Sequence, residues 1–182
     1  MDTSSIARRP QSDAQKSGIV TSTPPPLAPQ ARRVQEWLRQ RGFALSVVEL
    51  PQAAPTAVAA AAILGCELGQ IVKSLIFRAV PSGRPVLILT SGANRVNEQL
   101  IAPHLGEAVV RANAAFVRAA TGFEIGGVPP VAHRVTPVTF IDADLLTYPE
   151  LWAAAGTPRT QLRLTPEQLL SITGGAVIEL KA

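Results

Sequence analysis

The segment TGFEIGGVPPVAHR concentrates residues that constrain the backbone between two apolar runs. Gly126 and Gly127 permit backbone conformations and close approaches that are closed to other residues. Pro129 and Pro130 fix φ and remove two N–H donors, and Val128 before them is directed toward extended geometry. We expect a stiff loop at residues 126–130, the Gly-Pro loop, whose remaining N–H groups have fixed directions. Such a loop can be a simple turn, or it can stabilise an oxyanion.

A single lysine interrupts an apolar run upstream of this loop. Lys73 is the only charged residue between Ile71 and Phe77. A buried ammonium group is costly unless it is paired or faces a cleft. Two interpretations stay open: the side chain points outward from an edge strand, or it lies in a cleft and holds an anionic or polar group of a ligand.

The remaining reactive residues form no recognisable catalytic set. Cys66 is the only cysteine and has no base near it in sequence, so a small structural residue is favoured over a nucleophile. His104 and His133 lack metal-ligand spacing, so no metal site is expected. Asp142 and Asp144 could bind a cation, but a solvated turn is favoured. The polar turn SGANR could line a pocket wall, although alone it is a weak signal.

Composition indicates one globular domain. The chain has 182 residues, of which 47% are hydrophobic and 16% charged. Residues 1–29 are rich in Ser, Thr, Gln and Pro and predict a disordered tail, leaving 30–182 as the domain. The net charge of +4 permits a polyanionic partner without requiring one. A single cysteine and no apolar stretch near the ~20 residues of a membrane span favour a cytoplasmic protein.

Strands and short helices alternate irregularly along the chain. The ambiguous segment is 151–155, whose alanines favour a helix but whose following Gly156 and Pro158 are typical of a hairpin. The pattern predicts a mixed α/β (α+β) fold: one compact domain with a mixed, mostly antiparallel sheet surrounded by short helices. Helices are expected at 31–41, 55–64, 97–105, 113–120 and 166–172. Strands are expected at 43–50, 71–80, 85–90, 108–111, 138–141, 161–164 and 176–180.

Three segments together resemble one protein family. They are GQIVKSLIF with its strand lysine, ATGFEIGGVPPV followed by TFID, and AAAGTPRTQLRLTPEQLLSITGG. They are similar to the YbaK / prolyl-tRNA-synthetase-associated editing domain family, whose members hydrolyse wrongly charged aminoacyl-tRNA in trans. The similarity spans about residues 30–180, and the lysine and the loop in this order and separation are specific together.

The resemblance implies a pocket between the lysine strand and the Gly-Pro loop, and a mechanism without a protein nucleophile. The catalytic residues that it implies are Lys73, Gly126, Gly127 and Pro129. The expected substrate-binding residues are Ser74, Asn94, Val128, Ala154 and Gly156. Two departures stand out: Ala154 is apolar where several relatives are polar, and Gln161 replaces an aspartate of the branch specific for Cys-tRNA(Pro). The second departure puts that particular substrate in doubt.

We therefore expect a free-standing aminoacyl-tRNA deacylase that needs no metal or organic cofactor. Its substrate would carry a small amino acid such as Ala, Ser, Thr or Cys, and an aminoacyl-tRNA synthetase could be a partner. Two rival functions stay open: a non-catalytic module that binds the tRNA acceptor end or an aminoacyl group, and a hydrolase for a small ester or amide. A homodimer is also compatible with exposed edge strands. The candidates for phosphate contacts are Arg78, Arg84, Arg95, Arg118 and Arg134, although most of them are expected to be plain solvated charges.

Overall fold

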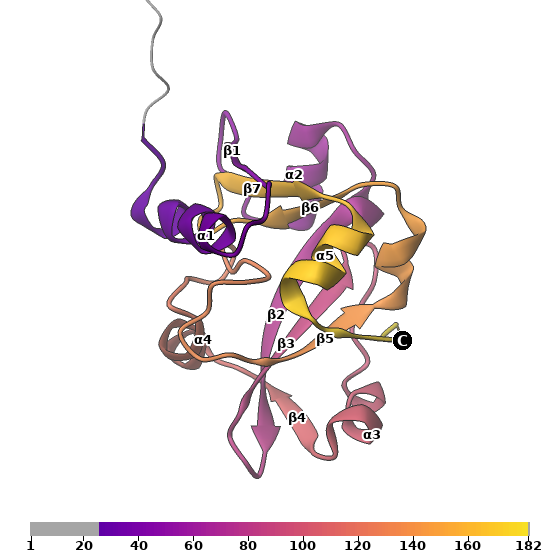
Figure 1. Ribbon diagram of the computed structural model, residues 1–182. Helices are drawn as coiled ribbons and strands as arrows, with labels where there is room; N and C mark the ends of the chain where they lie inside the picture. Colours follow the sequence, from indigo (N-terminus) through magenta and orange to yellow (C-terminus); the bar gives the residue numbers. More distant parts are fainter. Residues whose placement is uncertain (1–25, 182) are drawn as a thin grey trace, which may run out of the picture.

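The computed structural model describes residues 26–181 and centres on an eight-stranded mixed sheet (Figure 1). The strand order is β1-β7-β6-β2-β3-β5-β8, and β4 pairs with β2 beside this path. The strands are β1 (Val47–Glu49), β2 (Ile71–Val80), β3 (Pro85–Ser91), β4 (Ala108–Arg111), β5 (Val138–Asp142), β6 (Leu151–Ala154), β7 (Thr160–Leu164) and β8 (Ala176–Ile178).

Most strand pairs are antiparallel, as predicted. The antiparallel pairs are β1–β7, β6–β7, β2–β3 and β2–β4, whereas β2–β6, β3–β5 and β5–β8 are parallel. The long strand β2 is rich in β-branched and apolar residues, and it pairs with β3 from Val72 to Arg78. The tight β2–β3 hairpin makes this pair the centre of the sheet, and the predicted fold class is confirmed.

In the described part of the chain, five α-helices surround the sheet: α1 (Pro29–Gln40), α2 (Ala57–Leu64), α3 (Ala102–Leu105), α4 (Ala114–Thr121) and α5 (Pro166–Thr173). Their ends follow local signals. The Thr56 hydroxyl accepts a hydrogen bond from the Ala59 N–H at the start of α2, and Gly65 ends that helix in the left-handed conformation. Thr165 and Gln168 form a capping box at the start of α5.

Two predicted elements differ from the structure. The strand expected at 43–50 is reduced to β1 because the Gln35 side chain binds Leu45 O at 3.0 Å and Val47 N at 2.8 Å, which holds this segment against α1. The helix expected at 97–105 is divided into a 3-10 turn at Glu98–Leu100 and α3, where Pro103 lies in the first turn and supplies no N–H.

The ambiguous segment 151–155 forms a strand. Residues Leu151–Ala154 are β6, which pairs with β7 as a hairpin around Gly156, whose φ is 105°. Most of the predicted tail, residues 1–25, lies outside the described residues, and Pro29 already belongs to α1. Within residues 26–181, no helix has the length and apolar character that crossing a membrane requires.

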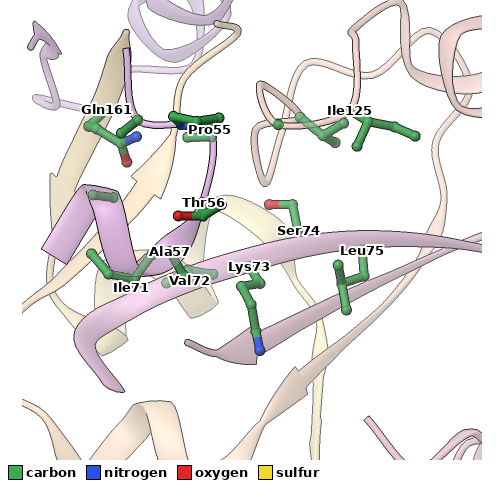
Figure 2. Close-up of a pocket in the computed structure, with 15 residues that line it drawn as sticks. Pro55, Thr56, Ala57, Ile71, Val72, Lys73, Ser74, Leu75, Ile125 and Gln161 are labelled. Carbon is green, nitrogen blue, oxygen red and sulfur yellow. The ribbon is translucent and has the colours of Figure 1, made fainter. Parts of the chain in front are cut away.

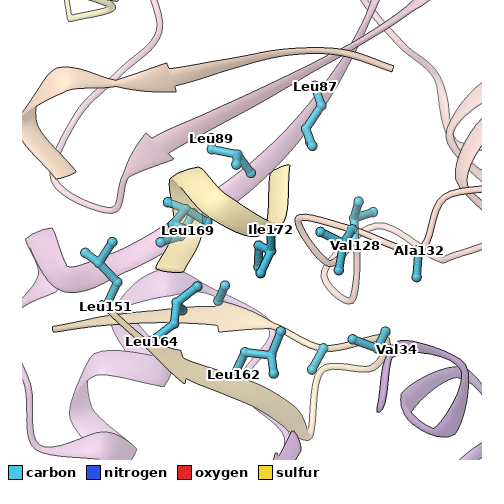
Figure 3. Packing of buried hydrophobic residues seen from close by; sticks show 14 of the residues in the cluster. Val34, Leu87, Leu89, Val128, Ala132, Leu151, Leu162, Leu164, Leu169 and Ile172 are labelled. Atoms are coloured by element: carbon cyan, nitrogen blue, oxygen red, sulfur yellow. The ribbon is translucent and has the colours of Figure 1, made fainter. Parts of the chain in front are cut away.

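The largest core cluster joins the sheet, α1, α5 and the Gly-Pro loop (Figure 3). Leu162 of β7, Ile172 of α5 and Val128 of the loop are all buried in this cluster. The core therefore fixes the loop through Val128, which leaves the neighbouring glycines at a defined distance from β2.

Candidate active site

A pocket of about 280 Å³ lies between β2, α2 and the Gly-Pro loop (Figure 2). Its mouth is formed by exposed residues and its floor by buried ones. Pro55, Thr56, Ile125 and Gly126 are the exposed lining residues. The buried ones are Ala54, Ala60, Ile71, Val72, Val128 and Gln161. Lys73, Ser74, Leu75, Ala57 and Ala154 complete the wall.

The pocket lies at a gap in the pairing of β2. Gly92 N–H donates to Ile71 O, and Ala79 N–H donates to Arg84 O. Because antiparallel ladders alternate, odd-numbered residues of β2 direct their main-chain groups toward β3 and even-numbered ones toward the opposite edge. On that edge β6 pairs only with Ile71 and Val72, and β4 pairs from Phe77 onward. The main-chain N–H and C=O of Ser74 therefore face the gap between β6 and β4.

Lys73 is not on an edge strand, because β2 lies inside the sheet, with β3 along one side and β6 and β4 at the two ends of the other. Its ammonium donates to Gly92 O at 3.2 Å and also to Asn94 O. Figure 2 shows the Lys73 and Ser74 side chains extending to opposite sides of β2. Burial lowers the pKa of Lys73, while the nearby Asp142 carboxylate opposes this shift and Arg95 adds to it. The lysine is thus a partly buried cation with two of its three donors already engaged.

Asp142 organises the turn that holds this lysine. Its carboxylate is 1% exposed, and one oxygen accepts hydrogen bonds from the Thr90 hydroxyl at 2.8 Å, Ser91 N at 3.1 Å and Asn94 Nδ2 at 2.9 Å. The prediction of a solvated turn is wrong for Asp142, because these donors from β3 and the following turn replace water. Asn94, expected to bind substrate, donates to both Asp142 and Asp144 in this turn and lies outside the pocket lining.

The Gly-Pro loop presents Gly126 and Val128 to the pocket. Gly127 N–H donates to Glu124 O at 3.0 Å, so this donor is engaged within the loop. Gly126 has a φ of 89°, and a Cβ there would meet no atom closer than 4.0 Å. Pro129 is buried behind the loop, and its carbonyl oxygen accepts from His133 Nε2 at 2.8 Å.

Gly127 and Gly156 act together as a packing contact. Gly156 N–H donates to Gly127 O at 2.9 Å, and a Cβ at Gly127 would lie 2.9 Å from Gly156 O. A Cβ at Gly156 would lie 2.7 Å from the Gln30 backbone of α1. Neither glycine lines the pocket, whereas Ala154, in the β6–β7 hairpin around Gly156, forms part of its wall. The structure thus brings together Lys73, Ser74, Gly126, Val128 and Ala154 and puts the other expected site residues around them.

Two pocket residues carry buried polar atoms that lack a partner. Within residues 26–181, Ser74 Oγ and Gln161 Oε1 are the buried side-chain oxygens or nitrogens without a hydrogen bond. Both line this pocket. The sequence marked Gln161 only as a departure from a family pattern, and the pairing of β7 with β6 opposite Ala154 is what places it in the site.

The arginines expected to contact phosphates divide into two groups. Arg84 pairs with Glu107 and Arg118 with Glu124. Arg78, Arg95 and Arg134 have no carboxylate within 4.0 Å in the described part of the chain. Burial raises the pKa of the Cys66 thiol, which disfavours the thiolate and agrees with a structural role. No cluster of three His, Cys, Asp or Glu side chains suited to a metal occurs among residues 26–181.

Comparison with known proteins identifies the family. The sequence model described as the aminoacyl-tRNA editing domain matches residues 51–172, a span that holds the lysine strand, the Gly-Pro loop and Gln161. The chain belongs to the aminoacyl-tRNA editing domain family. The predicted resemblance and the assignment to the aminoacyl-tRNA deacylase class are therefore confirmed at the level of the family.

Individual relatives of this editing domain agree. A solved structure described as a proposed trans-editing enzyme for prolyl-tRNA synthetase is 49% identical, with a TM-score of 0.82 over 86% of this chain and 99% of that one. A proposed Cys-tRNA(Pro)/Cys-tRNA(Cys) deacylase, EbsC of Enterococcus faecalis, is 28% identical over 64% of this chain and 71% of its own length. The uncharacterized protein YwhH of Bacillus subtilis is 28% identical over 74% of this chain and 82% of its own.

Proposed function

We propose that this editing domain is a free-standing hydrolase that deacylates mischarged tRNA carrying a small amino acid. The observation that carries the proposal is the pocket itself, where a desolvated lysine and a stiff glycine loop flank a gap in the sheet. Its volume of about 280 Å³ suits an aminoacyl group and part of the terminal ribose but excludes the tRNA body. The family supports aminoacyl-tRNA as the substrate class.

Ester hydrolysis needs a nucleophile, a stabilised oxyanion and a proton for the leaving group. Water attacks the ester carbonyl, the new C–O bond forms a tetrahedral oxyanion, and the bond to the ribose oxygen then breaks as that oxygen gains a proton. Because Gly127 N–H is engaged, we assign the oxyanion donors to the N–H groups of Gly126 and Val128. Each such donor can contribute about two to three powers of ten in rate.

The lysine supplies charge and position. Lys73 is the single titratable side chain among the residues that line the pocket. Its side chain extends to the side of β2 opposite Ser74, and two of its donors are held by main-chain carbonyls, so Lys73 would act on the carbonyl or the terminal phosphate of the substrate through its positive charge. Activation of the attacking water would then fall to the substrate, through its vicinal ribose hydroxyl.

A second candidate function is a non-catalytic module that binds the aminoacylated acceptor end. It is favoured by one observation: among residues 26–181, no carboxylate or histidine lines the pocket to act as a general base. This module would hold the ester and protect it rather than cleave it.

A deacylation panel separates the candidates. Mischarged tRNAs carrying Ala, Ser, Thr or Cys, with Pro-tRNA as the correctly charged control, are incubated with wild type and with Lys73→Ala. Release of one or two amino acids by the wild type, lost in Lys73→Ala, is the expected result. Salt-sensitive tRNA binding without release would leave the binding module, and hydrolysis of simple esters independent of tRNA would favour a small-ester hydrolase.

A further inference from the structure

The polar character of the pocket floor is concentrated in one residue. Of the six buried lining residues, five are apolar and the sixth is Gln161, which is 4% exposed. Its Oε1 has no hydrogen-bond partner within residues 26–181. A buried carboxamide oxygen without a partner is unfavourable, so its retention on an apolar floor points to a polar group that arrives with a ligand.

The ligand part that reaches this floor follows from the size of the pocket. The ester linkage must stay near the mouth, because the ribose continues into a tRNA that a pocket of about 280 Å³ cannot admit. The exposed residues Pro55, Ile125 and Gly126 mark that mouth. In Figure 2, Gln161 lies across the pocket from Ile125. The group that extends farthest from the ester, toward the floor, is the amino-acid side chain.

Small side chains differ in what they offer an amide. A hydroxyl both donates and accepts, so it can pair with the oxygen or the nitrogen of the Gln161 carboxamide. A methyl group offers neither interaction and leaves the amide buried and unpaired, and a thiol is only a weak donor and acceptor. Ser74 Oγ, the second unpartnered atom of the pocket, adds another site that a hydroxyl satisfies and a methyl does not.

We propose that Gln161 is a specificity-determining residue and that the pocket selects aminoacyl groups with a hydroxyl side chain, seryl or threonyl, over alanyl and cysteinyl. This inference rests on the proposed function for the identity of the ligand as an aminoacyl ester. A site built to hydrogen-bond a substrate hydroxyl discriminates against the analogue that lacks it, because binding that analogue leaves protein groups unpaired.

The test compares two stable probes, adenosines that carry seryl or alanyl through a 3′-amide in place of the ester. Calorimetric binding is measured for wild type, Gln161→Leu and the closer-length Gln161→Met, with the exposed Gln99→Leu as the matched control. The wild type and Gln99→Leu should bind the seryl probe about tenfold or more tighter than the alanyl probe. Both Gln161 variants should lose most of that ratio, chiefly because they bind the seryl probe more weakly.

The outcomes are distinct from those of the deacylation panel. Equal wild-type affinity for the two probes, or binding of neither, would overturn the hydroxyl preference even if some aminoacyl-tRNA were hydrolysed. A weakening of both probes to the same extent in the Gln161 variants would assign the amide to the shared α-amino group instead, which also overturns it. A seryl preference without any tRNA hydrolysis would keep the specificity and reject the enzyme. The comparison of the two probes with the wild-type protein does not depend on whether the Gln161 variants fold.

Discussion

Two pockets of about 280 Å³ each lie against the same loop, yet their chemistry differs. The first is lined by Gly126 and Val128, and the second by the residues that follow, from Pro130 to His133. In the second pocket three polar side chains have partners, and the first is Thr173, whose Oγ1 donates to Leu169 O at 2.7 Å. His133 Nε2 bonds to Pro129 O, and Arg41 lies 4.1 Å from the Trp37 ring centroid.

The difference shows that hollow volume alone does not mark a site. The first pocket holds Ser74 Oγ and Gln161 Oε1 without partners and a lysine whose pKa is lowered by burial. Buried polar groups without hydrogen-bond partners are typical of sites where a ligand supplies the missing partner. Polar groups whose hydrogen bonds are made within the protein contribute to the stability of the fold. We therefore propose that the first pocket is the functional one and that the second supports the loop.

Filling each pocket in turn should give the largest contrast. Ala154→Leu extends a side chain into the first pocket, and Thr136→Leu does the same at the second. Because a misplaced substrate loses about a hundredfold in rate, kcat/KM for deacylation should fall at least that far in Ala154→Leu. Thr136→Leu, at an exposed residue, should stay within about twofold. The reverse order in a steady-state assay would move the site to the second pocket.

Removing the charge of Asp142 should act on the lysine of the first pocket. Asp142→Asn leaves the donors of Thr90, Ser91 and Asn94 to share one neutral acceptor, which should lower the free energy of unfolding by about 2 kcal/mol. The Asp142 charge opposes the lowering of the Lys73 pKa, so its loss should lower that pKa further. Binding of the seryl-amide adenosine probe should weaken at alkaline pH as Lys73 loses its proton. In Asp142→Asn this loss of binding should occur at lower pH than in the wild type.

The pH titration of analogue binding checks this shift, with the more exposed Glu98→Gln as its control. An unchanged alkaline limb in Asp142→Asn would mean that the charge of Lys73 does not contribute to binding.

The two adjacent glycines of the loop should differ in their response to a methyl group. Gly127→Ala places Cβ 2.9 Å from Gly156 O and Thr157 Cα, so backbone must move, and we expect a loss of about 1–3 kcal/mol in stability and about tenfold in activity. A Cβ at Gly126 would meet no atom closer than 4.0 Å, so Gly126→Ala should lose only about 1–2 kcal/mol, the cost of its positive φ. Thermal unfolding and kcat/KM measure both effects. Equal activity losses with unequal stability losses would separate the Gly126 contribution to catalysis from packing.

Changes in the second pocket should alter the stability of the fold rather than the deacylation activity. Burial lowers the pKa of His133 from 6.5 to about 4, so the folded protein binds this proton less readily than the unfolded chain. Stability should therefore fall as pH drops from 6.5 toward 4, by up to about 3 kcal/mol, and level off below. His133→Gln should lack this part of the acid destabilisation, while the exposed His104→Gln should keep it. Urea unfolding at pH 7.5 and pH 4 measures the difference, and parallel losses in all three proteins would refute the assignment.

Local signals made part of this molecule predictable. The bounds of β2 and the cap of α2 follow from residues within one element: the apolar run 71–80, Thr56 and Gly65. The resemblance to the editing family predicted that Lys73 and the Gly-Pro loop would lie at the same pocket. Lys73 and Gly126 both line the first pocket.

Other features depend on contacts between distant segments and could not be read locally. Asp142 looks like a turn residue until β3 supplies its donors across 51 and 52 positions of sequence. Gln35 shortens β1 by a side-chain contact from α1. Gln161 lies in β7, and the register between β7 and β6 decides which face of the sheet its side chain is on. The sequence of β7 alone therefore does not assign Gln161 to the pocket floor.

A crystal structure with the seryl-amide adenosine probe tests the central claim most directly. We predict the seryl group in the first pocket, with its hydroxyl at Gln161, its carbonyl oxygen facing the N–H groups of Gly126 and Val128, and the adenosine leaving through the mouth beside Ile125. A probe seated in the second pocket, or bound in the first with its carbonyl turned away from the Gly-Pro loop, would contradict the account.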